Sequence, residues 1–231
     1  MKPTKQFFLG IVLAVTLSGC AVMDLQPSTL QDAYPKMYDS TPASILILPP
    51  INNTSAADAK EYFACSLSEA VGLKGYYIFP VEAVFDILRD EGYYDTETLT
   101  PGILANLNKH FGADAVLFST IEKWDKSWFL VSGSLTMEAN FALVRTVQAD
   151  TLWDYSITTT INLGSDSKTL LGMAIDSALK TAMEDYFPNA RLANIQTFRE
   201  ALPYGKHHPD FGTDGQNPIP IDKHDYISID K

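Results

Sequence analysis

The chain has 231 residues, of which 28 are acidic, 17 basic and 46% apolar, with a formal net charge of −11. This acidity, with no basic stripe in the sequence, excludes the electrostatic footprint of a nucleic-acid-binding protein. The apolar content suffices for one well-packed domain, or one domain with a tail.

The N-terminus carries the signals of an exported lipoprotein. Two lysines precede an eleven-residue apolar stretch, which is shorter than the roughly 20 apolar residues of a membrane-spanning helix. The stretch Leu17–Cys20 resembles the bacterial lipobox, in which small residues precede a cysteine that receives a diacylglyceryl group. We therefore predict a signal peptide over residues 1–19, cleavage between Gly19 and Cys20, and lipidation of Cys20. An ordinary secretory signal with an accidental cysteine is the alternative.

Lipidation would fix the location of the mature protein. Cleavage removes two of the 17 basic residues and no acidic one, so the mature balance is 15 minus 28, or −13. Several acyl chains, palmitate among them, would anchor the chain stably, whereas a single chain is marginal. Ala21, not Asp, follows the lipidated cysteine. By analogy with the sorting rule of enteric bacteria, this predicts an outer-membrane protein that faces the periplasm.

Cys65 is the second of the two cysteines. If lipid consumes Cys20, Cys65 has no partner for an intrachain disulfide. It lies in a helical pattern with Phe63 and Leu67, which favours a buried structural thiol over a reactive one.

The composition divides the mature chain into three parts. Residues 20–43 begin with the lipidated cysteine and continue as a polar stretch with three prolines. We predict a flexible tether there with a reach of about 25 Å. Residues 44–188 carry the apolar periods of a globular domain. Residues 189–231, in which the apolar period weakens and Pro, Gly and Asp accumulate, are predicted to form an extended tail.

Within the domain, apolar runs and helical periods predict the order β-α-β-α-α-β, followed by a β-hairpin and a C-terminal helix. This order indicates a single α/β domain, in two or three layers, with a mixed sheet. The strands are expected at 45–48, 76–79, 115–121, 132–147 and 151–163. The helices are expected at 55–73, 80–92, 100–112 and 165–187, the last one stopped by Pro188.

Motifs for chemistry are scarce. The group His207-His208-Pro209-Asp210 is the best metal candidate, but it lacks a second ligand pair, and a solvated loop is the simpler interpretation. His110 is expected to interact with the C-terminus of its helix. Nucleophile elbows, phosphate-binding loops and dinucleotide fingerprints are missing from the sequence. We predict no catalytic residues, no metal and no cofactor, with a hydrolase assembled from scattered acids as a remaining hypothesis.

One aromatic segment is a candidate interface. Residues 121–129 place Trp124, Trp128 and Phe129 around an expected turn with few apolar neighbours. Trp and Tyr are enriched where proteins meet, because they are large, stiff and tipped with one polar group. We predict that these three residues form a contact surface. The alternative is that the two tryptophans cap the core of the sheet.

Several stretches are similar to one bacterial lipoprotein family of unknown function, known for a meningococcal surface-antigen candidate. They are Ile45–Thr54, Gly75–Val81, Phe111–Leu117, Leu152–Asp154 and Leu202–Pro209, and the resemblance spans roughly residues 17–210. It implies a fold like the N-terminal domain of TolB, a homodimer, and a neighbouring lipoprotein that resembles the curli secretion channel. No catalytic residues come with it. Lys206-His207 stands where the family would have a proline and an aromatic residue.

These observations favour a non-enzymatic outer-membrane lipoprotein that binds other envelope proteins as an accessory in assembly or secretion. The alternative is a periplasmic lipoprotein that binds a small ligand or peptidoglycan. That function predicts a concave pocket near the carboxyl ends of the strands that start at Ile45 and Ala115.

Overall fold

The computed structural model describes residues 29–57, 59–93, 96, 102–129, 132–164 and 186–220. The signal peptide with its cleavage site, Cys20 and most of the helix predicted before Pro188 lie outside the described residues.

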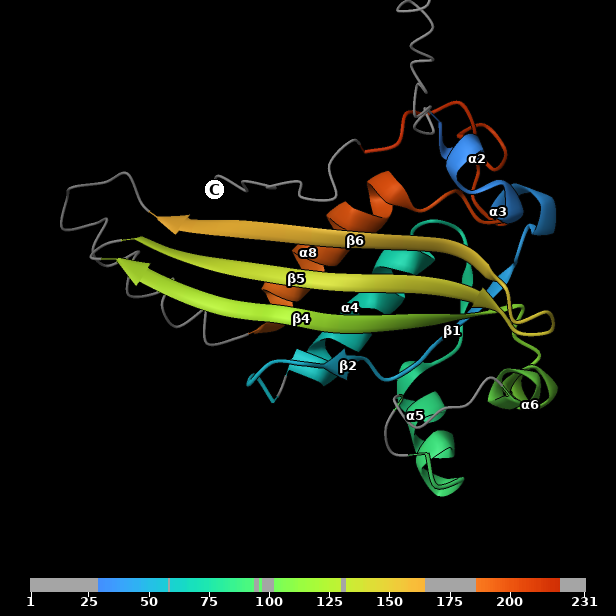
Figure 1. Ribbon diagram of the computed structural model, residues 1–231, viewed down its shortest axis with the longest axis horizontal. Coiled ribbons are helices and arrows are strands. Elements are labelled where there is room, and N and C mark those ends of the chain that lie inside the picture. The colour runs from blue at the N-terminus through green and yellow to red at the C-terminus, as the bar shows by residue number, and fades with distance from the viewer. Residues whose placement is uncertain are drawn as a thin grey trace, which may run out of the picture.

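A single mixed sheet of six strands organises the domain, as predicted (Figure 1). Its order is β3-β1-β4-β5-β6, and β2 pairs with β4 beyond the end of β1. β1, β2 and β3 join by parallel pairing, whereas β4, β5 and β6 form antiparallel pairs. The strands are β1 (Ser44–Ile47), β2 (Ile51–Asn52), β3 (Tyr77–Ile78), β4 (Ala115–Phe129), β5 (Ser132–Arg145) and β6 (Thr151–Gly164).

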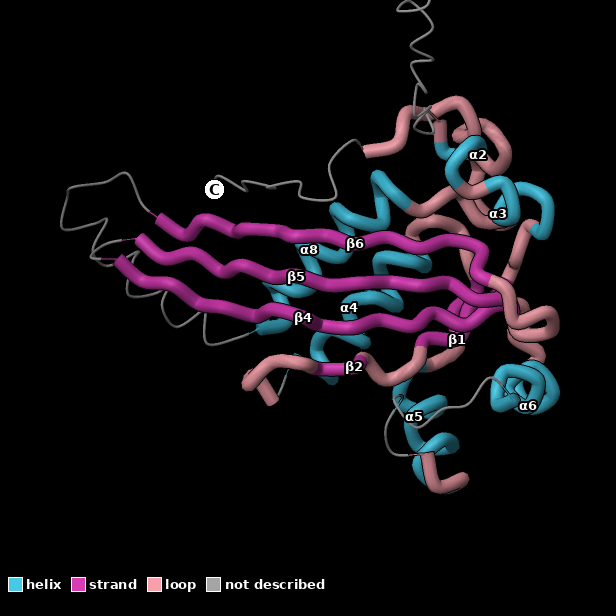
Figure 2. Tube along the Cα trace, in the orientation of Figure 1, coloured by secondary structure: helices cyan, strands magenta, loops and turns pink. Residues whose placement is uncertain are grey.

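The described helices cover the two faces of this sheet around β1. They are α2 (Leu30–Ala33), α3 (Pro35–Ser40), α4 (Ala59–Gly72), α5 (Val81–Asp90), α6 (Gly102–Phe111) and α8 (Tyr186–Ala201). α4 and α8 lie behind β4, β5 and β6 in the view of Figure 2, and α5 and α6 lie beside β1. In β1, Ile45 and Ile47 belong to one buried cluster while Leu46 and Leu48 belong to the other. A strand buried on both faces reads as a continuous apolar run, which is why β1 was recognisable.

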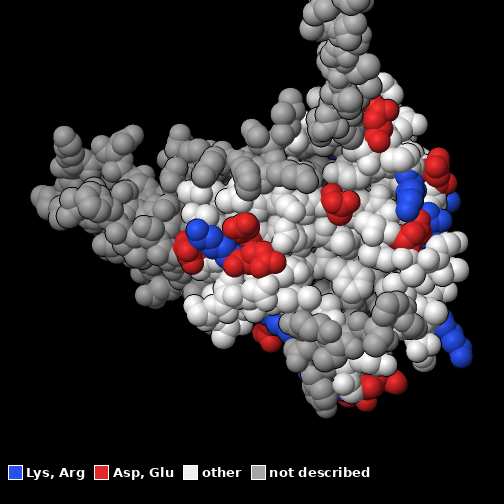
Figure 3. All heavy atoms as spheres, in the orientation of Figure 1, with Lys and Arg blue, Asp and Glu red and all other residues white. Residues whose placement is uncertain are grey.

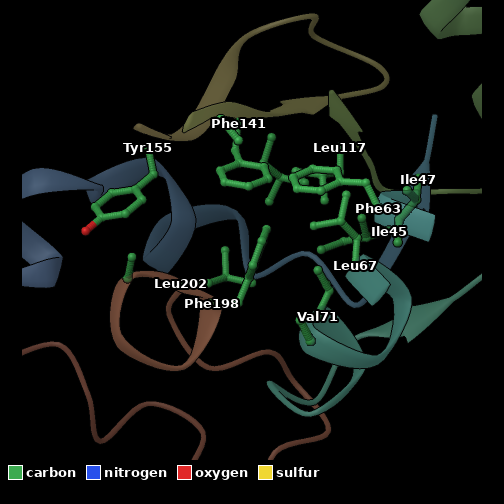
Figure 4. Close-up of a cluster of buried hydrophobic side chains, with 14 of the residues drawn as sticks. Ile45, Ile47, Phe63, Leu67, Val71, Leu117, Phe141, Tyr155, Phe198 and Leu202 are labelled. Atoms are coloured by element: carbon green, nitrogen blue, oxygen red, sulfur yellow. The ribbon is translucent and has the colours of Figure 1, made fainter. Parts of the chain in front are cut away.

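The larger cluster fills the space between the sheet and the helix pair α4 and α8 (Figure 4). Phe63 of α4 stacks on Phe141 of β5, with ring centroids 5.9 Å apart and planes within 6°. Phe198 of α8 meets Phe141 edge-on at 5.0 Å. Such aromatic pairs contribute about 0.5–1.5 kcal/mol each beyond the area that they bury.

β4 continues through the segment where we expected a turn. Its pairing with β5 shifts register between Ile121 and Lys123, which marks a β-bulge. The extra residue allows Ile121 and Trp124, three positions apart, to be buried in the same cluster while Glu122 stays exposed. The bulge broke the two-residue alternation that identifies a strand in sequence. The loop of the predicted hairpin, at Gln148–Asp150, does connect β5 to β6.

The predicted tether is wrong for residues 29–43, because this segment is folded. Thr29 caps α2, its side chain accepting a hydrogen bond from the amide of Asp32. Leu30 and Met37 are 2% and 3% exposed. The amide of Leu30 donates to the carbonyl of Asn217, nearly 190 residues further along the chain, so nothing local in the sequence marks this segment as part of the domain.

The predicted tail is also wrong over its first part. α8 begins before Pro188 and continues to Ala201, because proline is tolerated in a first helical turn, where its missing N–H has no intrahelical partner. Phe198 and Leu202 are buried. The domain therefore continues well past its predicted boundary at residue 188.

Residues 202–218, which we name the C-terminal clasp, close the domain. Near the start of the clasp, the amides of Gly205 and His207 donate to the carbonyls of Lys74 and Gly75, at 2.7 and 3.0 Å. Near its end, the carbonyls of Gly215 and Asn217 accept from the first residues of α2. The clasp thus joins the turn before β3 to the N-terminal helices.

The close approach at Gly75 predicts a large effect of a small substitution. Gly75 has φ +83°, and a Cβ atom there would meet the backbone nitrogen of His208 at 2.3 Å. Gly92 has φ +86° with open space around it. We expect Gly92→Ala to lower the free energy of unfolding by about 1 kcal/mol, the cost of the left-handed conformation alone. Gly75→Ala should cost at least about 3 kcal/mol, because the clasp must also move. Urea denaturation measures both, and equal losses would contradict the role given to the clasp.

Candidate functional site

The main candidate site is a groove of about 410 Å³ beside the edge strand β3. One wall is the face of α4 that carries Cys65, Ser68 and Glu69, and the floor is formed by residues 76–79. Residues 80–82, at the start of α5, close one end. We refer to it as the β3 groove.

The groove lies at an open edge of the sheet. The amide of Tyr77 donates to the carbonyl of Ala43 at 2.9 Å, so the backbone groups of Tyr77 point toward β1. Backbone groups alternate in direction along a strand, and the amide and carbonyl of Ile78 therefore point away from the sheet. Next to this edge, the side chains of Leu73 and Tyr77 are 59% and 55% exposed. Large apolar groups beside an unpaired strand edge are typical of a surface that another chain covers.

Acidic groups flank the groove. The Cys65 thiol donates to Oε1 of Glu82 at 3.8 Å. Burial raises the pKa of Cys65, and the carboxylates of Glu82 and Glu61 raise it further. The thiol therefore stays protonated at neutral pH, which disfavours reactivity, as predicted; it is half-buried, however, where we expected it to be buried.

Glu69, on the same wall, has its charge compensated. The Arg191 guanidinium donates to both of its carboxylate oxygens, at 2.5 and 2.6 Å, and holds the pKa of Glu69 below its usual value. This pair joins α4 to α8. Among the described residues that line the groove there is no lysine or arginine, so Glu82 faces it without a cation in the lining.

The clasp buries a second charged group close to the groove. Lys74 is 6% exposed, its Nζ donates to the carbonyl of Arg199 at 3.1 Å, and it lies 4.1 Å from the centroid of the Tyr204 ring. The ring of His208 stacks on Tyr204 at 3.8 Å. Burial lowers the pKa of Lys74 to about 8, although the buried carboxylate of Asp214 opposes this shift.

The histidine group in the clasp is an exposed loop, as the simpler interpretation predicted, and backbone hydrogen bonds hold it in place. His207 donates its amide to Gly75, and Nδ1 of His208 accepts from the amide of Asp210 at 3.1 Å. In the parts of the chain that the structure describes, no three histidine, cysteine or acidic side chains gather as metal ligands would. His110 lies in the last turn of α6, where it was expected.

Two further hollows lie near the clasp. A polar one of about 390 Å³ lies at the amino ends of β1 and β4, the opposite ends from those where we expected a ligand pocket. Two of its charged groups have partners, since Asp114 accepts from the amides of Ala43 and Ser44 and Arg145 pairs with Asp150 at 3.2 Å. An apolar one of about 250 Å³ is lined by Tyr38, Tyr204 and Phe211, with other residues of α3 and the clasp.

The interface predicted from the sequence is wrong for Trp124. Its side chain is 6% exposed and belongs to the large buried cluster, so the core alternative holds. Trp128 and Phe129 pair with Gly133 and Ser132 in the sheet, and their side chains lie outside the description, so their role in an interface stays a prediction. The surface that sequence reasoning missed is at Tyr77. The adjacent pair Tyr76-Tyr77 was the available signal, because alternate residues of a strand face opposite sides.

The face of β4, β5 and β6 that looks away from α4 and α8 carries acidic groups with basic groups beside them (Figure 3). Glu122 is one of the acidic residues, and it is held in place by hydrogen bonds from the side-chain amides of Asn53 and Asn140, at 2.8 and 3.1 Å. Nothing on this face is as apolar and exposed as the Leu73 and Tyr77 pair, among the residues described there. The β3 groove therefore remains the stronger candidate.

Comparison with known proteins gives the relationship. A family described as "Putative lipoprotein GNA1162-like" matches residues 32–205. The chain belongs to this family. A relative in Neisseria meningitidis serogroup B (strain ATCC BAA-335 / MC58), "Putative lipoprotein NMB1124/NMB1162", is 25% identical over 175 residues, which cover 76% of this chain and 80% of the relative. The resemblance seen in the sequence is confirmed.

The chain is also similar to solved structures of lipoproteins. The crystal structure of lipoprotein GNA1162 from Neisseria meningitidis is 28% identical, covering 62% of this chain and 100% of that chain, with a TM-score of 0.47. The C-terminal domain of LpoB from Salmonella enterica is 18% identical, covering 56% of this chain and 94% of that chain, with a TM-score of 0.37. Within the described ranges of our structure, no helix is both long and apolar enough to cross a membrane.

The two tryptophans of β4 should behave differently on truncation. Trp124→Ala removes a buried ring and should lower the free energy of unfolding by about 3–5 kcal/mol. Trp128→Ala, if the interface prediction is right, should weaken association in sedimentation runs and leave unfolding nearly unchanged. A stable Trp124→Ala protein would contradict its place in the core, and unaltered sedimentation of Trp128→Ala would end the aromatic-interface prediction.

The buried titratable groups predict a maximum of stability at moderately alkaline pH. Lys74 titrates near pH 8 when folded and near its ordinary 10.5 when unfolded, so the unfolded state binds more protons in between and the free energy of unfolding rises across that interval. Burial, with a further contribution from Asp154, raises the pKa of Tyr34 from 10.0 to about 12. Burial and Asp214 raise the pKa values of Tyr38 and Tyr76 in the same direction. Above pH 10 the unfolded state loses these tyrosine protons first, and stability falls.

Urea denaturation from pH 7 to 11 should therefore show a rise of about 1–3 kcal/mol and then a fall. Lys74→Met should remove the rise and keep the fall. Lys206→Met, which changes an exposed lysine of the clasp, should keep both. A rise that survives in Lys74→Met would assign it to another group.

Proposed function

We propose that this protein is a non-enzymatic lipoprotein of the outer membrane that binds other envelope proteins as an accessory in assembly or secretion. Two independent observations support an anchored protein. The chain belongs to a family of lipoproteins, and Leu17–Cys20 has the residues of a lipobox. Lipid on Cys20 would hold the domain at the membrane, and Ala21 favours the outer membrane facing the periplasm.

The observation that carries the binding role is the open edge of the sheet at β3. Tyr77 and Leu73 are exposed beside a groove of about 410 Å³, and the backbone of Ile78 faces outward. A protein partner is favoured over a substrate, because the groove has few reactive side chains. A protonated thiol and a few carboxylates provide no activated nucleophile. A neighbouring lipoprotein that resembles the curli secretion channel is our candidate partner, and homodimerisation is compatible with this function.

A small-ligand or peptidoglycan-binding role is the second candidate. The polar hollow at the amino ends of β1 and β4 favours it, because Arg145, Asp114 and Lys206 together present groups of both charges. The resident ion pair and hydrogen bonds there make it the weaker candidate, since a ligand must compete with them.

A crosslinked pull-down of the full-length, lipidated protein from native envelopes tests the proposal. We expect mass spectrometry to find one envelope protein in stoichiometric amount, and the unanchored Cys20→Ala protein to lose it. Mass spectrometry of the wild-type N-terminal peptide should also find acyl chains on Cys20. Recovery of the protein alone, in both forms, would contradict the partner-binding role and leave the ligand-binding alternative.

A further inference from the structure

We infer that the β3 groove binds an extended segment of a partner protein in which basic residues alternate with apolar ones. This inference rests on the proposed protein-binding function and adds the chemistry of the partner. It is carried by three features of the groove: an unpaired strand edge, exposed apolar side chains and uncompensated acidic groups.

The strand edge selects an extended occupant. Because Tyr77 faces β1, the amide and carbonyl of Ile78 are directed to the open side of the sheet. Just before β3 the clasp pairs with the turn, where the amides of Gly205 and His207 donate to the carbonyls of Lys74 and Gly75. A partner segment bonded to Ile78 would lie along the strand edge that follows this turn. Adding a strand to a sheet edge is a common mode of peptide recognition.

Apolar side chains supply the anchor for such a segment. Leu73 and Tyr77 project from the end of α4 and from β3, and both are more than half exposed. The Tyr77 ring is supported from below by Phe79, which it meets edge-on at 5.1 Å, and Phe79 in turn packs on Phe111 at 5.9 Å. A stiff, supported aromatic ring loses little conformational entropy when it is covered, which is the property of interface anchors.

The charges select a basic occupant. Glu82 lines the groove, and Glu61 lies close enough to Cys65, one turn away on α4, to raise the pKa of its thiol. Glu69 is already paired with Arg191, which lies outside the lining, and the described lining itself contains no lysine or arginine. A lysine or arginine of the partner would meet Glu82, while the apolar residues before and after it contact the exposed ring of Tyr77. In a strand, alternate side chains face opposite sides, so an alternating sequence satisfies both requirements.

A second copy of this chain fits the groove poorly. The chain is acidic as a whole, with a formal charge of −11, and two acidic grooves brought together would repel. A basic partner is attracted both by the groove and by the overall charge. The test must therefore separate the local effect of the groove from the net charge of the protein.

Fluorescence polarisation with a labelled peptide of alternating lysine and leucine is the experiment, run with the full chain. We expect saturable binding, with little binding of an alternating glutamate–leucine peptide or of a lysine–serine peptide. Tyr77→Ser and Glu82→Lys should each weaken binding by at least about tenfold, as expected for an interface anchor. Glu82→Gln serves as a milder second variant, because Glu82 lies in the first turn of α5 and Lys there opposes the helix dipole.

Matched controls carry the same changes elsewhere. Asp39→Lys places the same type of charge reversal on an exposed residue of α3, and Val147→Ser removes an apolar side chain that is 67% exposed at the hairpin loop. Both should stay within about threefold of the wild type, the range expected for sites outside the interface. Equal weakening by Asp39→Lys and Glu82→Lys would assign the binding to net charge and overturn the inference. Binding of the lysine–serine peptide as tight as that of the lysine–leucine peptide would overturn it as well.

The envelope pull-down, repeated with Tyr77→Ser and Glu82→Lys, separates the two proposals. Loss of the native partner in these variants, and not in the controls, supports the groove. Capture of the same partner by all variants would overturn the groove inference while the proposed function stands. Sedimentation of the wild type and Tyr77→Ser provides the remaining outcome, since self-association lost only in Tyr77→Ser would identify a second copy as the occupant and overturn the basic partner.

Discussion

The packing of Trp153 is the interaction on which the rest of this domain depends. Its indole is fully buried in β6, and its Nε1 donates to the carbonyl of Ala201 at 3.0 Å, where α8 ends. The ring also packs on Phe198 of α8, with ring centroids 5.5 Å apart, and on Tyr34, between α2 and α3, with centroids 6.3 Å apart. One side chain thus fixes two segments to the sheet, one from each end of the domain. A buried indole stabilises the fold through the apolar area that it buries, and its N–H forms a directional hydrogen bond. That bond fixes where α8 ends against β6.

That end point determines the shape of the candidate site. From Ala201 the chain enters the clasp, and the clasp pairs with Lys74 and Gly75 just before β3. The clasp covers the turn that leads into β3, so the open edge begins with β3 itself. The opposite wall of the groove is held by the pair of Arg191 and Glu69, which joins α8 to α4. The long antiparallel strands β4, β5 and β6 mainly support the helices and the clasp that form the β3 groove.

Elements whose signals are local were predictable from the sequence, and those that depend on distant partners were not. The run at β1 and the loop between β5 and β6 were recognised, because an apolar run and a turn sequence are complete signals in themselves. The bulge in β4 hid Trp124, and Pro188 was taken as a stop although it lies in the first turn of α8. The exposed side chain of Tyr77 followed from neither its residue type nor its spacing, since which member of the tyrosine pair faces outward depends on the pairing of β3 with β1.

The folding of the N-terminal helices has a consequence for where this domain can act. Cys20 and Thr29 are nine residues apart, which corresponds to at most about 30 Å of extended chain and to about 16 Å for a flexible one. If lipid holds Cys20, the domain samples a thin shell next to the bilayer and not the depth of the compartment. Within such a shell, a membrane-bound neighbour experiences an effective concentration in the millimolar range. Contacts of modest intrinsic affinity would then be sufficient for stable pairing, and a partner that diffuses freely would gain none of this advantage.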